Sequence, residues 1–304
     1  MIVFTEPFVQ IKDKTAVALG FFDGVHLGHK AVIQSAVKYS RENNIPAVVW
    51  TFLDSPKKSS RSSVLSITDN EERKAVFEAL GVDILIEFPF SEDVKGLTKD
   101  KFVNTVLKEK LNAEKVFCGF NYTFGAGGTG KAEELKQLCK KQNISVEISD
   151  KISVDGKTVS STVIREYIEN GFPEKAHMLL GRPYSIKGTV INGKKLGRTL
   201  GFPTANIHIP ENKVLPKDGV YLTVTSFDGK SFYGITNIGT NPTVDEKIRR
   251  AENFIFDFGE DIYGNEINID FLRFIRGEKK FDSVELLAEQ VKKDIETAKG
   301  MVGQ

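Results

Sequence analysis

Two of the four histidines in this 304-residue chain lie three residues apart, in the segment Gly20-Phe21-Phe22-Asp23-Gly24-Val25-His26-Leu27-Gly28-His29. A short apolar run at residues 15–19 precedes the segment, and a helical pattern follows it to residue 43. In a parallel sheet, ligands bind where a strand ends and the next helix begins, and a helix N-terminus favours anions. His26 and His29 can donate hydrogen bonds to a triphosphate there, and Gly28 lets the backbone approach a phosphate closely. A capping turn with two surface histidines is the alternative.

Three hydroxyl residues and an arginine open another candidate helix, in Ser160-Ser161-Thr162-Val163-Ile164-Arg165. Hydroxyl side chains are common helix caps, so this run alone predicts little more than a helix start. Hydroxyls, backbone N–H groups and the guanidinium fork of Arg165 can also hold a phosphate together. Beside the histidine pair, we interpret the run as the expected second clamp on a phosphate chain.

A glycine-rich loop at residues 125–132 matches the GxGxxG pattern, and it matches GxxxxGK up to Lys131. A phosphate-binding loop of the second kind needs Ser or Thr at the next position to hold Mg²⁺, and this chain has Ala132. The dinucleotide fingerprint normally follows the first strand of its unit, whereas this loop follows the fourth candidate strand. We therefore interpret both matches as coincidental, in a loop that can still lie close to a bound nucleotide.

A glycine-spaced basic segment at residues 188–198 contains Gly188, Gly193 and Gly197, and Gly201-Phe202-Pro203-Thr204-Ala205-Asn206 follows it. Such a flap can close over phosphates through its backbone N–H groups. The hydroxyl of Thr204 and the amide oxygen of Asn206 are oxygen ligands of the kind that Mg²⁺ takes. A barrel hairpin with glycine bulges is the alternative.

Glu252 stands at the start of a candidate strand, residues 253–257, and so at the rim of a predicted barrel. A carboxylate in that position can act as a general base toward a hydroxyl group. A solvated surface glutamate is the alternative.

The two halves of the chain follow different patterns. Continuous apolar strands alternate with helices in the first half, which predicts a parallel α/β sheet; the strands are expected at residues 15–19, 47–52, 84–88, 115–118 and 145–148. A capping box of Thr68 and Glu71 is expected to open the helix that ends near Leu80. The second half predicts a small antiparallel barrel with one covering helix at residues 283–297; its strands are expected at residues 184–190, 220–226, 231–237, 253–257 and 266–274. The boundary falls near residues 181–183, so domains of residues 1–182 and 183–304 are expected.

The composition excludes several classes of protein. Forty-two Lys and Arg against 41 Asp and Glu leave a net charge of +1, so no global basic field indicates nucleic acid or an acidic membrane surface. No apolar run approaches the ~20 residues of a membrane span. The two cysteines, Cys118 and Cys139, lie far apart without CxxC spacing, which excludes a disulfide scaffold and argues against zinc. We expect a cytoplasmic protein, of an oligomeric state that the sequence leaves open.

Taken in order, these motifs resemble the prokaryotic bifunctional riboflavin kinase/FAD synthetase (FMN adenylyltransferase) family. The resemblance extends from about residue 16 to residue 294. Its first half consists of residues 20–29, Gly119-Phe120-Asn121-Tyr122-Thr123-Phe124-Gly125 and residues 160–165. Its second half consists of residues 201–206, 216–221 and 237–243, Glu252 and residues 274–281. Each motif alone has moderate specificity, and seven in register over two domains are highly specific.

The resemblance implies a Rossmann-like nucleotidylyltransferase domain followed by a small antiparallel β-barrel with a terminal helix. The barrel would phosphorylate riboflavin to FMN with ATP, and the first domain would transfer AMP from a second ATP to FMN. The implied adenylyltransferase residues are Gly20, Phe21, Asp23, Gly24, His26, Gly28, His29, Asn121, Ser160, Ser161, Thr162 and Arg165. The implied kinase residues are Gly188, Gly193, Gly197, Thr204, Asn206, Glu252 and Arg276. Within these sets, His26, His29 and Arg165 would be catalytic with Glu252 as the kinase base, Thr204 and Asn206 would bind Mg²⁺, and Arg276 would contact the flavin side.

The chain departs from the family in two places. The family usually has Thr-Phe-x-Pro-His-Pro after the second strand, and here Asp54 and Ser55 replace Pro and His. The family often has His two residues after the catalytic Glu, where this chain has Phe254. The first departure keeps open a kinase with a weakened adenylyltransferase half. A non-catalytic flavin-binding protein and an NAD-type oxidoreductase are rival hypotheses.

Overall fold

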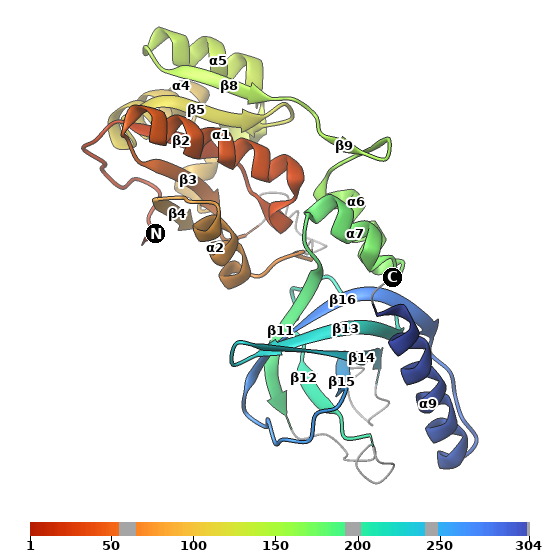
Figure 1. Cartoon of the computed structure of the whole chain (residues 1–304). Helices are drawn as coiled ribbons and strands as arrows, with labels where there is room; N and C mark the ends of the chain where they lie inside the picture. The colour runs from red at the N-terminus through yellow and green to blue at the C-terminus, as the bar shows by residue number, and fades with distance from the viewer. Residues whose placement is uncertain (55–64, 192–201, 241–248, 303–304) are drawn as a thin grey trace. The chain divides into compact units, whose positions relative to one another are not determined.

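The computed structural model describes residues 1–54, 65–191, 202–240 and 249–302 (Figure 1). They form two units, residues 1–161 and 162–304, and each unit is built around a sheet of its own.

A six-stranded parallel sheet forms the centre of the first unit, with the order β1-β4-β3-β2-β5-β8. Its strands are β1 (Ile2–Phe4), β2 (Thr15–Leu19), β3 (Ala47–Phe52), β4 (Ile84–Phe88), β5 (Ala113–Gly119) and β8 (Ser145–Ser149). The predicted parallel α/β architecture is confirmed. The sequence patterns missed β1, because an edge strand of three residues with an exposed start carries almost no signal.

Helices cover both faces of this sheet. Every residue of β2 is buried, and because successive side chains of a strand point to opposite faces, both faces need a cover. Ala16 and Ala18 pack with α1 (Leu27–Asn43) and α2 (Asn70–Ala79), whereas Val17 and Leu19 pack with the π-helix η2 (Phe102–Lys110) and α5 (Ala132–Lys141). The shorter elements are η1 (Asp23–Val25), α3 (Glu92–Lys95), α4 (Lys99–Lys101), β6 (Thr123–Phe124), η3 (Ala126–Gly128), β7 (Gly130–Lys131), β9 (Ser153–Val154) and β10 (Lys157–Thr158).

The predicted capping box of α2 is wrong by one residue. Asp69 is the N-cap, its carboxylate accepts from the Glu72 N–H at 2.8 Å, and the Glu72 carboxylate accepts from the Asp69 N–H at 3.0 Å. The Thr68 hydroxyl instead accepts a hydrogen bond from the backbone N–H of Gly24 at 3.1 Å. A contact 44 residues away along the chain therefore takes the hydroxyl that the local pattern assigned to the cap.

The second unit is a closed barrel of six strands with the order β11-β12-β15-β14-β13-β16, and all its pairings are antiparallel. This confirms the predicted small antiparallel barrel. Two helices precede the strands and one follows them: α6 (Ser161–Glu169), α7 (Pro173–Leu180), β11 (Tyr184–Ile191), β12 (Ala205–His208), β13 (Gly219–Phe227), β14 (Lys230–Thr240), β15 (Arg249–Ile255), β16 (Glu266–Gly277) and α9 (Val284–Met301).

Two barrel strands differ from the prediction. The four-residue β12 was missed, since Ala-Asn-Ile-His is too short and too polar to give a strand pattern. β15 begins at Arg249 rather than at residue 253, so Glu252 lies within the strand and not at its start. Both strands are held by the barrel's ladders, in which β12 pairs with β11 and β15.

The outer and inner faces of the barrel differ in polarity. Outside, Val220, Leu222 and Ile235 pack with Ala298 of α9, which confirms the predicted covering helix. Inside, the fully buried Asn253 donates to the Thr236 hydroxyl at 2.8 Å and accepts from the Thr225 hydroxyl at 3.1 Å. Buried amides and hydroxyls are tolerated when they bond to one another in this way.

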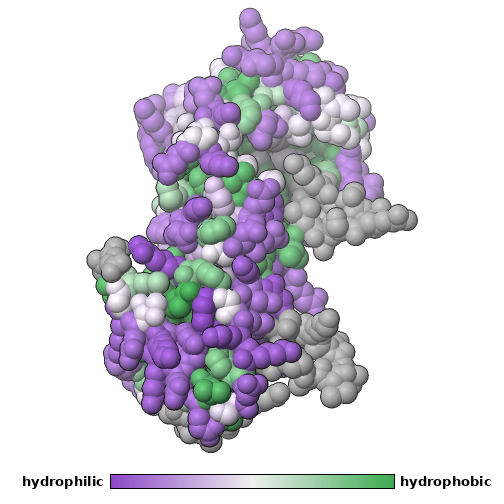
Figure 2. Space-filling view, turned by 90° about the vertical axis from the view of Figure 1, so that its right-hand side faces the viewer, coloured by the Kyte–Doolittle hydropathy of each residue, from purple (hydrophilic) through white to green (hydrophobic). Residues whose placement is uncertain are grey.

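The molecular surface drawn in Figure 2 is mainly hydrophilic, and its hydrophobic residues gather in small, separate groups. Within the described residues, no helix combines the length and the apolar character that a membrane crossing requires.

The shifted capping box gives a first prediction. Asp69→Ala should lower the free energy of unfolding of the first unit by ~1 kcal/mol, because it leaves an N-terminal N–H of α2 without its acceptor. Urea unfolding followed by the fluorescence of Trp50 measures this, because the single tryptophan lies in the core of that unit. Glu71→Ala is the control: Glu71 is 75% exposed, and its loss should cost no more than ~0.5 kcal/mol. An equal cost for both variants would contradict the assignment of the cap.

Candidate active sites

The loop between β2 and α1 has an unusual backbone. Gly24 has φ 79°, and two residues with side chains, Phe22 and Val25, also have positive φ angles of 56° and 37°. A β-branched residue in this region is strained, by about 1–3 kcal/mol, and persists only where its surroundings impose it. Here the surroundings include the bond from Gly24 to Thr68 and a bond of 2.9 Å from the backbone N–H of Ile67 to Asp23 Oδ1.

This loop delivers the two histidines as a stacked pair. Their ring centroids are 3.6 Å apart and their planes differ by 16°. His26 is the N-cap of α1, and its Nδ1 accepts from the backbone N–H of His29 at 3.2 Å. An accepting Nδ1 carries no proton, so the neutral form of the His26 ring has its proton on Nε2.

Gly28 makes room for this arrangement. A Cβ atom at position 28 would lie 3.2 Å from Cε1 of the His26 ring, closer than such contacts normally come. Gly28 therefore admits the imidazole of His26, and its predicted close approach to a phosphate stays a prediction.

His29 lies in an environment that keeps its ring neutral. The ring of Phe22 meets it edge-on at 5.3 Å, and its Nδ1 is buried with no hydrogen-bond partner among the described residues. Burial, followed by the nearby His26 and Arg73, holds the pKa of His29 well below its ordinary value of 6.5. The pair can therefore donate hydrogen bonds at neutral pH without bringing two adjacent positive charges into contact.

The hydroxyl run meets the histidine loop at one residue. The Ser161 hydroxyl donates to the backbone carbonyl of Asp23 at 3.0 Å, which places Ser160 and Ser161 beside the loop. Thr162 and Arg165 lie on α6 in the second unit, so their predicted part in a phosphate clamp stays a prediction.

The remaining predicted residues of this site lie at the same edge of the sheet. Gly20 and Phe21 follow β2 directly, and Asn121 is exposed in the turn after β5. Residues 125–131 form the turn and second strand of the β6–β7 hairpin, with Lys131 as the N-cap of α5. This hairpin is consistent with the interpretation of the two glycine-loop matches as coincidental. An open hollow of about 650 Å³ beside Phe120 and Lys131 contains neither histidine.

In the barrel, three polar residues form a row across neighbouring strands. Glu252 of β15 is paired with Asn206 of β12 on one side and with Asn237 of β14 on the other. Directly paired residues in antiparallel strands point to the same face, with Cβ atoms about 4.5–5.5 Å apart. Asn206 is 6% exposed, and Glu252 is partly exposed. The individual motifs did not predict the row, because β12 was missed.

A separate cavity of about 290 Å³ lies at the end of the barrel, and none of the three residues of the row lines it. Its wall combines apolar and polar side chains from the ends of β11, β12 and β15 and from the segment after β15, including Thr204, Asn253, Ile255, Phe258 and Asp261. Gly188 lies in β11, where a Cβ would meet the carbonyl oxygen of His208 at 2.8 Å. Gly193 and Gly197 lie outside the described residues.

Arg276 forms an ion pair with Asp294. Its Nε lies 2.9 Å from Asp294 Oδ1 and its Nη2 lies 2.7 Å from Oδ2, so the pair joins the end of β16 to α9. The predicted contact of Arg276 with the flavin side stays a prediction.

Comparison with known proteins places the chain in a family. The FAD synthetase family model matches residues 9–163, and the riboflavin kinase model matches residues 180–302. A bifunctional riboflavin kinase/FMN adenylyltransferase from Listeria monocytogenes is 40% identical over 281 residues, covering 91% of this chain and 89% of its own length. The chain belongs to the bifunctional riboflavin kinase/FMN adenylyltransferase family. This confirms the resemblance found from the motifs, and the match of both models favours two activities over the kinase-only alternative.

Two further relatives extend the comparison. The Bacillus subtilis protein of the same name is 36% identical over 309 residues, covering 97% of this chain and 95% of its own length. The crystal structure of a macrolide-efflux protein from Streptococcus pneumoniae superposes with a TM-score of 0.91 at 34% identity, covering 98% of this chain and 99% of that one.

The lowered pKa of His29 gives a second prediction. Below about pH 6.5 the unfolded chain binds a proton at His29 that the folded chain does not, so folding stability must fall as the pH falls. His29→Gln removes this proton binding, and its melting temperature should drop less than that of the natural chain between about pH 7.5 and about pH 5.5. Thermal unfolding followed by Trp50 fluorescence provides the comparison. Equal drops in both proteins would show that His29 titrates normally in the folded state.

Proposed function

We propose that the chain makes FAD from riboflavin in two ATP-dependent steps, with residues 183–304 as the kinase and residues 1–182 as the adenylyltransferase. The observation that carries this proposal is the stacked histidine pair at the N-terminus of α1, since it offers hydrogen-bond donors where anions are favoured. The polar row around Glu252 in the barrel supports the second chemistry.

The adenylyl transfer needs no protein nucleophile. A phosphate oxygen of FMN attacks the α-phosphorus of ATP, the bond to the bridging oxygen breaks, and pyrophosphate leaves with the electron pair. Charge builds up on the phosphate oxygens, where Nε2–H of His26, the ring of His29 and the N-terminus of α1 stabilise it. Donors placed in this way contribute ~10²–10³ each to the rate. Ser160, Ser161, Thr162 and Arg165 complete the proposed clamp, and Asn121 lies near the nucleotide.

The kinase step needs a base and a way to hold phosphates. The proposed base is Glu252, which takes the proton of the terminal ribityl hydroxyl as its oxygen attacks the γ-phosphorus and ADP leaves. The cavity at the end of the barrel, beside Thr204, is the proposed nucleotide pocket. The apolar side chains of its lining suit the adenine ring of ATP, and the polar side chains suit the phosphates.

The proposed Mg²⁺ site consists of Thr204 and Asn206 together with the phosphates of ATP. A hydroxyl and an amide oxygen two residues apart are oxygen donors of the kind that Mg²⁺ takes beside phosphates. The Glu252 carboxylate, paired across from Asn206, stays available as the base. When bound, the ion would neutralise negative charge on the phosphates. Both cysteines are free thiols, which supports the proposed cytoplasmic location.

Glu252→Gln should separate the two activities. It keeps the size of the side chain but removes the base, so riboflavin phosphorylation should fall by about 10²–10⁴ while riboflavin binding changes little. FAD formation from supplied FMN should continue at the rate of the natural chain. Chromatographic separation of riboflavin, FMN and FAD over time measures both reactions. Equal loss of both in a folded variant would contradict the assignment of one site to each unit.

Gly28→Ala should have the opposite pattern. The added methyl must push the His26 ring by a few tenths of an ångström, so FAD formation from FMN should fall by about tenfold while FMN formation is unaffected. The melting temperature should not decrease, since Ala favours the helix by up to ~1 kcal/mol over Gly. The matched control is Gly300→Ala, in α9, where the added Cβ meets no atom within 4 Å. Full FAD synthesis by Gly28→Ala would contradict the proposed role of the His26 position.

A further inference from the structure

A buried ion pair lies behind the histidine loop. Arg73 of α2 and Glu87 of β4 form it, and their side chains are 3% and 1% exposed. The Nζ atom of the partly exposed Lys74 lies 3.8 Å from Glu87 Oε2. Removing two ions from water is unfavourable, and replacing a buried pair by apolar side chains of similar size is often neutral or stabilising. Stability alone is therefore a weak reason for this pair.

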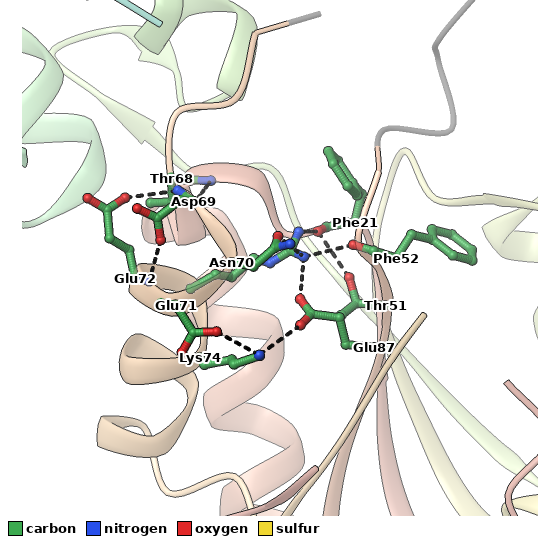
Figure 3. Close-up of polar contacts among 12 residues, drawn as sticks. Phe21, Thr51, Phe52, Thr68, Asp69, Asn70, Glu71, Glu72, Lys74 and Glu87 are labelled. Carbon is green, nitrogen blue, oxygen red and sulfur yellow. Dashed lines mark hydrogen bonds and ion pairs between the residues drawn. The ribbon is translucent and has the colours of Figure 1, made fainter. Parts of the chain in front are cut away.

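The guanidinium of Arg73 holds two strand ends together. Its Nη1 donates to the backbone carbonyl of Phe21 at 3.1 Å, and its Nη2 donates to that of Phe52 at 2.8 Å. The Thr51 hydroxyl donates to the same Phe21 carbonyl at 3.0 Å. In Figure 3, the dashed lines from Phe21, Phe52 and Glu87 converge on the nitrogen atoms of one guanidinium group, that of Arg73. Phe21 belongs to the loop that follows β2 and Phe52 ends β3, so one side chain ties the carboxyl ends of two adjacent strands.

From Phe21 the contacts lead to the histidines. The next residue, Phe22, has a left-handed backbone and is 2% exposed, and its ring packs edge-on against His29 at 5.3 Å. His29 in turn stacks on His26 and donates its backbone N–H to the Nδ1 of that ring. A shift of the Phe21 carbonyl would therefore move the Phe22 ring and the imidazole that it supports.

We propose that Arg73, neutralised by Glu87, is a positioning residue for adenylyl transfer, because it fixes the Phe21 carbonyl and through Phe22 the stacked histidine pair. This inference rests on the proposed function of the first unit. The planar guanidinium suits the task, since its fork reaches the carbonyls of Phe21 and Phe52, Asn70 Oδ1 and the Glu87 carboxylate together. A lysine at this position has the charge but cannot reach all these acceptors at once.

Two variants test the proposal in the full-length protein. Arg73→Met combined with Glu87→Leu replaces the pair by apolar side chains, and Arg73→Lys keeps the charge without the fork. Each should lower kcat for FAD formation from FMN by about 10²-fold, because small misplacements of catalytic groups cost that much. KM for ATP and the riboflavin kinase activity should stay within about twofold, since uniform binding and the second unit are untouched. Glu71→Gln, at the exposed edge of the same network, is the matched control and should keep full activity.

A spectroscopic readout separates positioning from a merely structural role. The chain has four histidines, so the imidazole nitrogen signals of His26, His29, His177 and His208 can be assigned by NMR. Both variants should shift the signals of His26 and His29 and leave those of His177 and His208, which lie in the second unit.

Three results would overturn the inference. They are full kcat in a folded variant, loss of kcat with unshifted His26 and His29 signals, and loss that appears only where Trp50 fluorescence reports an unfolded first unit. Failure of the natural chain itself to make FAD from FMN would instead overturn the proposed function.

Discussion

The structure of the first unit depends on the complete burial of β2. Its five residues are all buried, and its backbone pairs with β3 on one side and β5 on the other. Such a strand has no room for a polar side chain aimed at a ligand, so chemistry can begin only where it ends. The loop from Gly20 to His26 follows at once, and α1 starts from that point with its N-terminus at the sheet edge. The place of the histidine pair is therefore a consequence of how the sheet is packed.

The loop needs support from distant parts of the chain. Phe22 and Val25 have positive φ angles, which local sequence disfavours. Thr68, Ile67 and Arg73 reach the loop from the segment before α2 and from α2 itself. The polar groups that hold it are deeply buried, which makes each bond stronger and each missing partner more costly.

The barrel places polar groups by a different rule. In antiparallel ladders, side chains alternate between the interior and the outer face, so Asn206, Glu252 and Asn237 share one side of the wall while Asn253 turns inward. The interior remains partly polar, with Asn253 bonded to threonines next to the cavity. One unit thus presents its groups at strand ends and the other along a row of paired strands.

The local sequence determined those strands and loops whose own residues carry a clear pattern. The apolar runs predicted β2, β3 and β4 with the bounds that the structure has, and the histidine and glycine spacing identified the loop after β2. Tertiary structure decided the rest: the cap at Asp69, the four-residue β12, the early start of β15, the stacked imidazoles and the ion pair of Arg73 and Glu87. The bond from Arg73 to Phe21 spans 52 residues. Even the features that join near neighbours depend on distant contacts. The Gly24 N–H takes the Thr68 hydroxyl and leaves the cap to Asp69, and Ile67 and Arg73 hold the loop that carries His26. A pattern in neighbouring residues cannot encode a partner that only folding brings into contact.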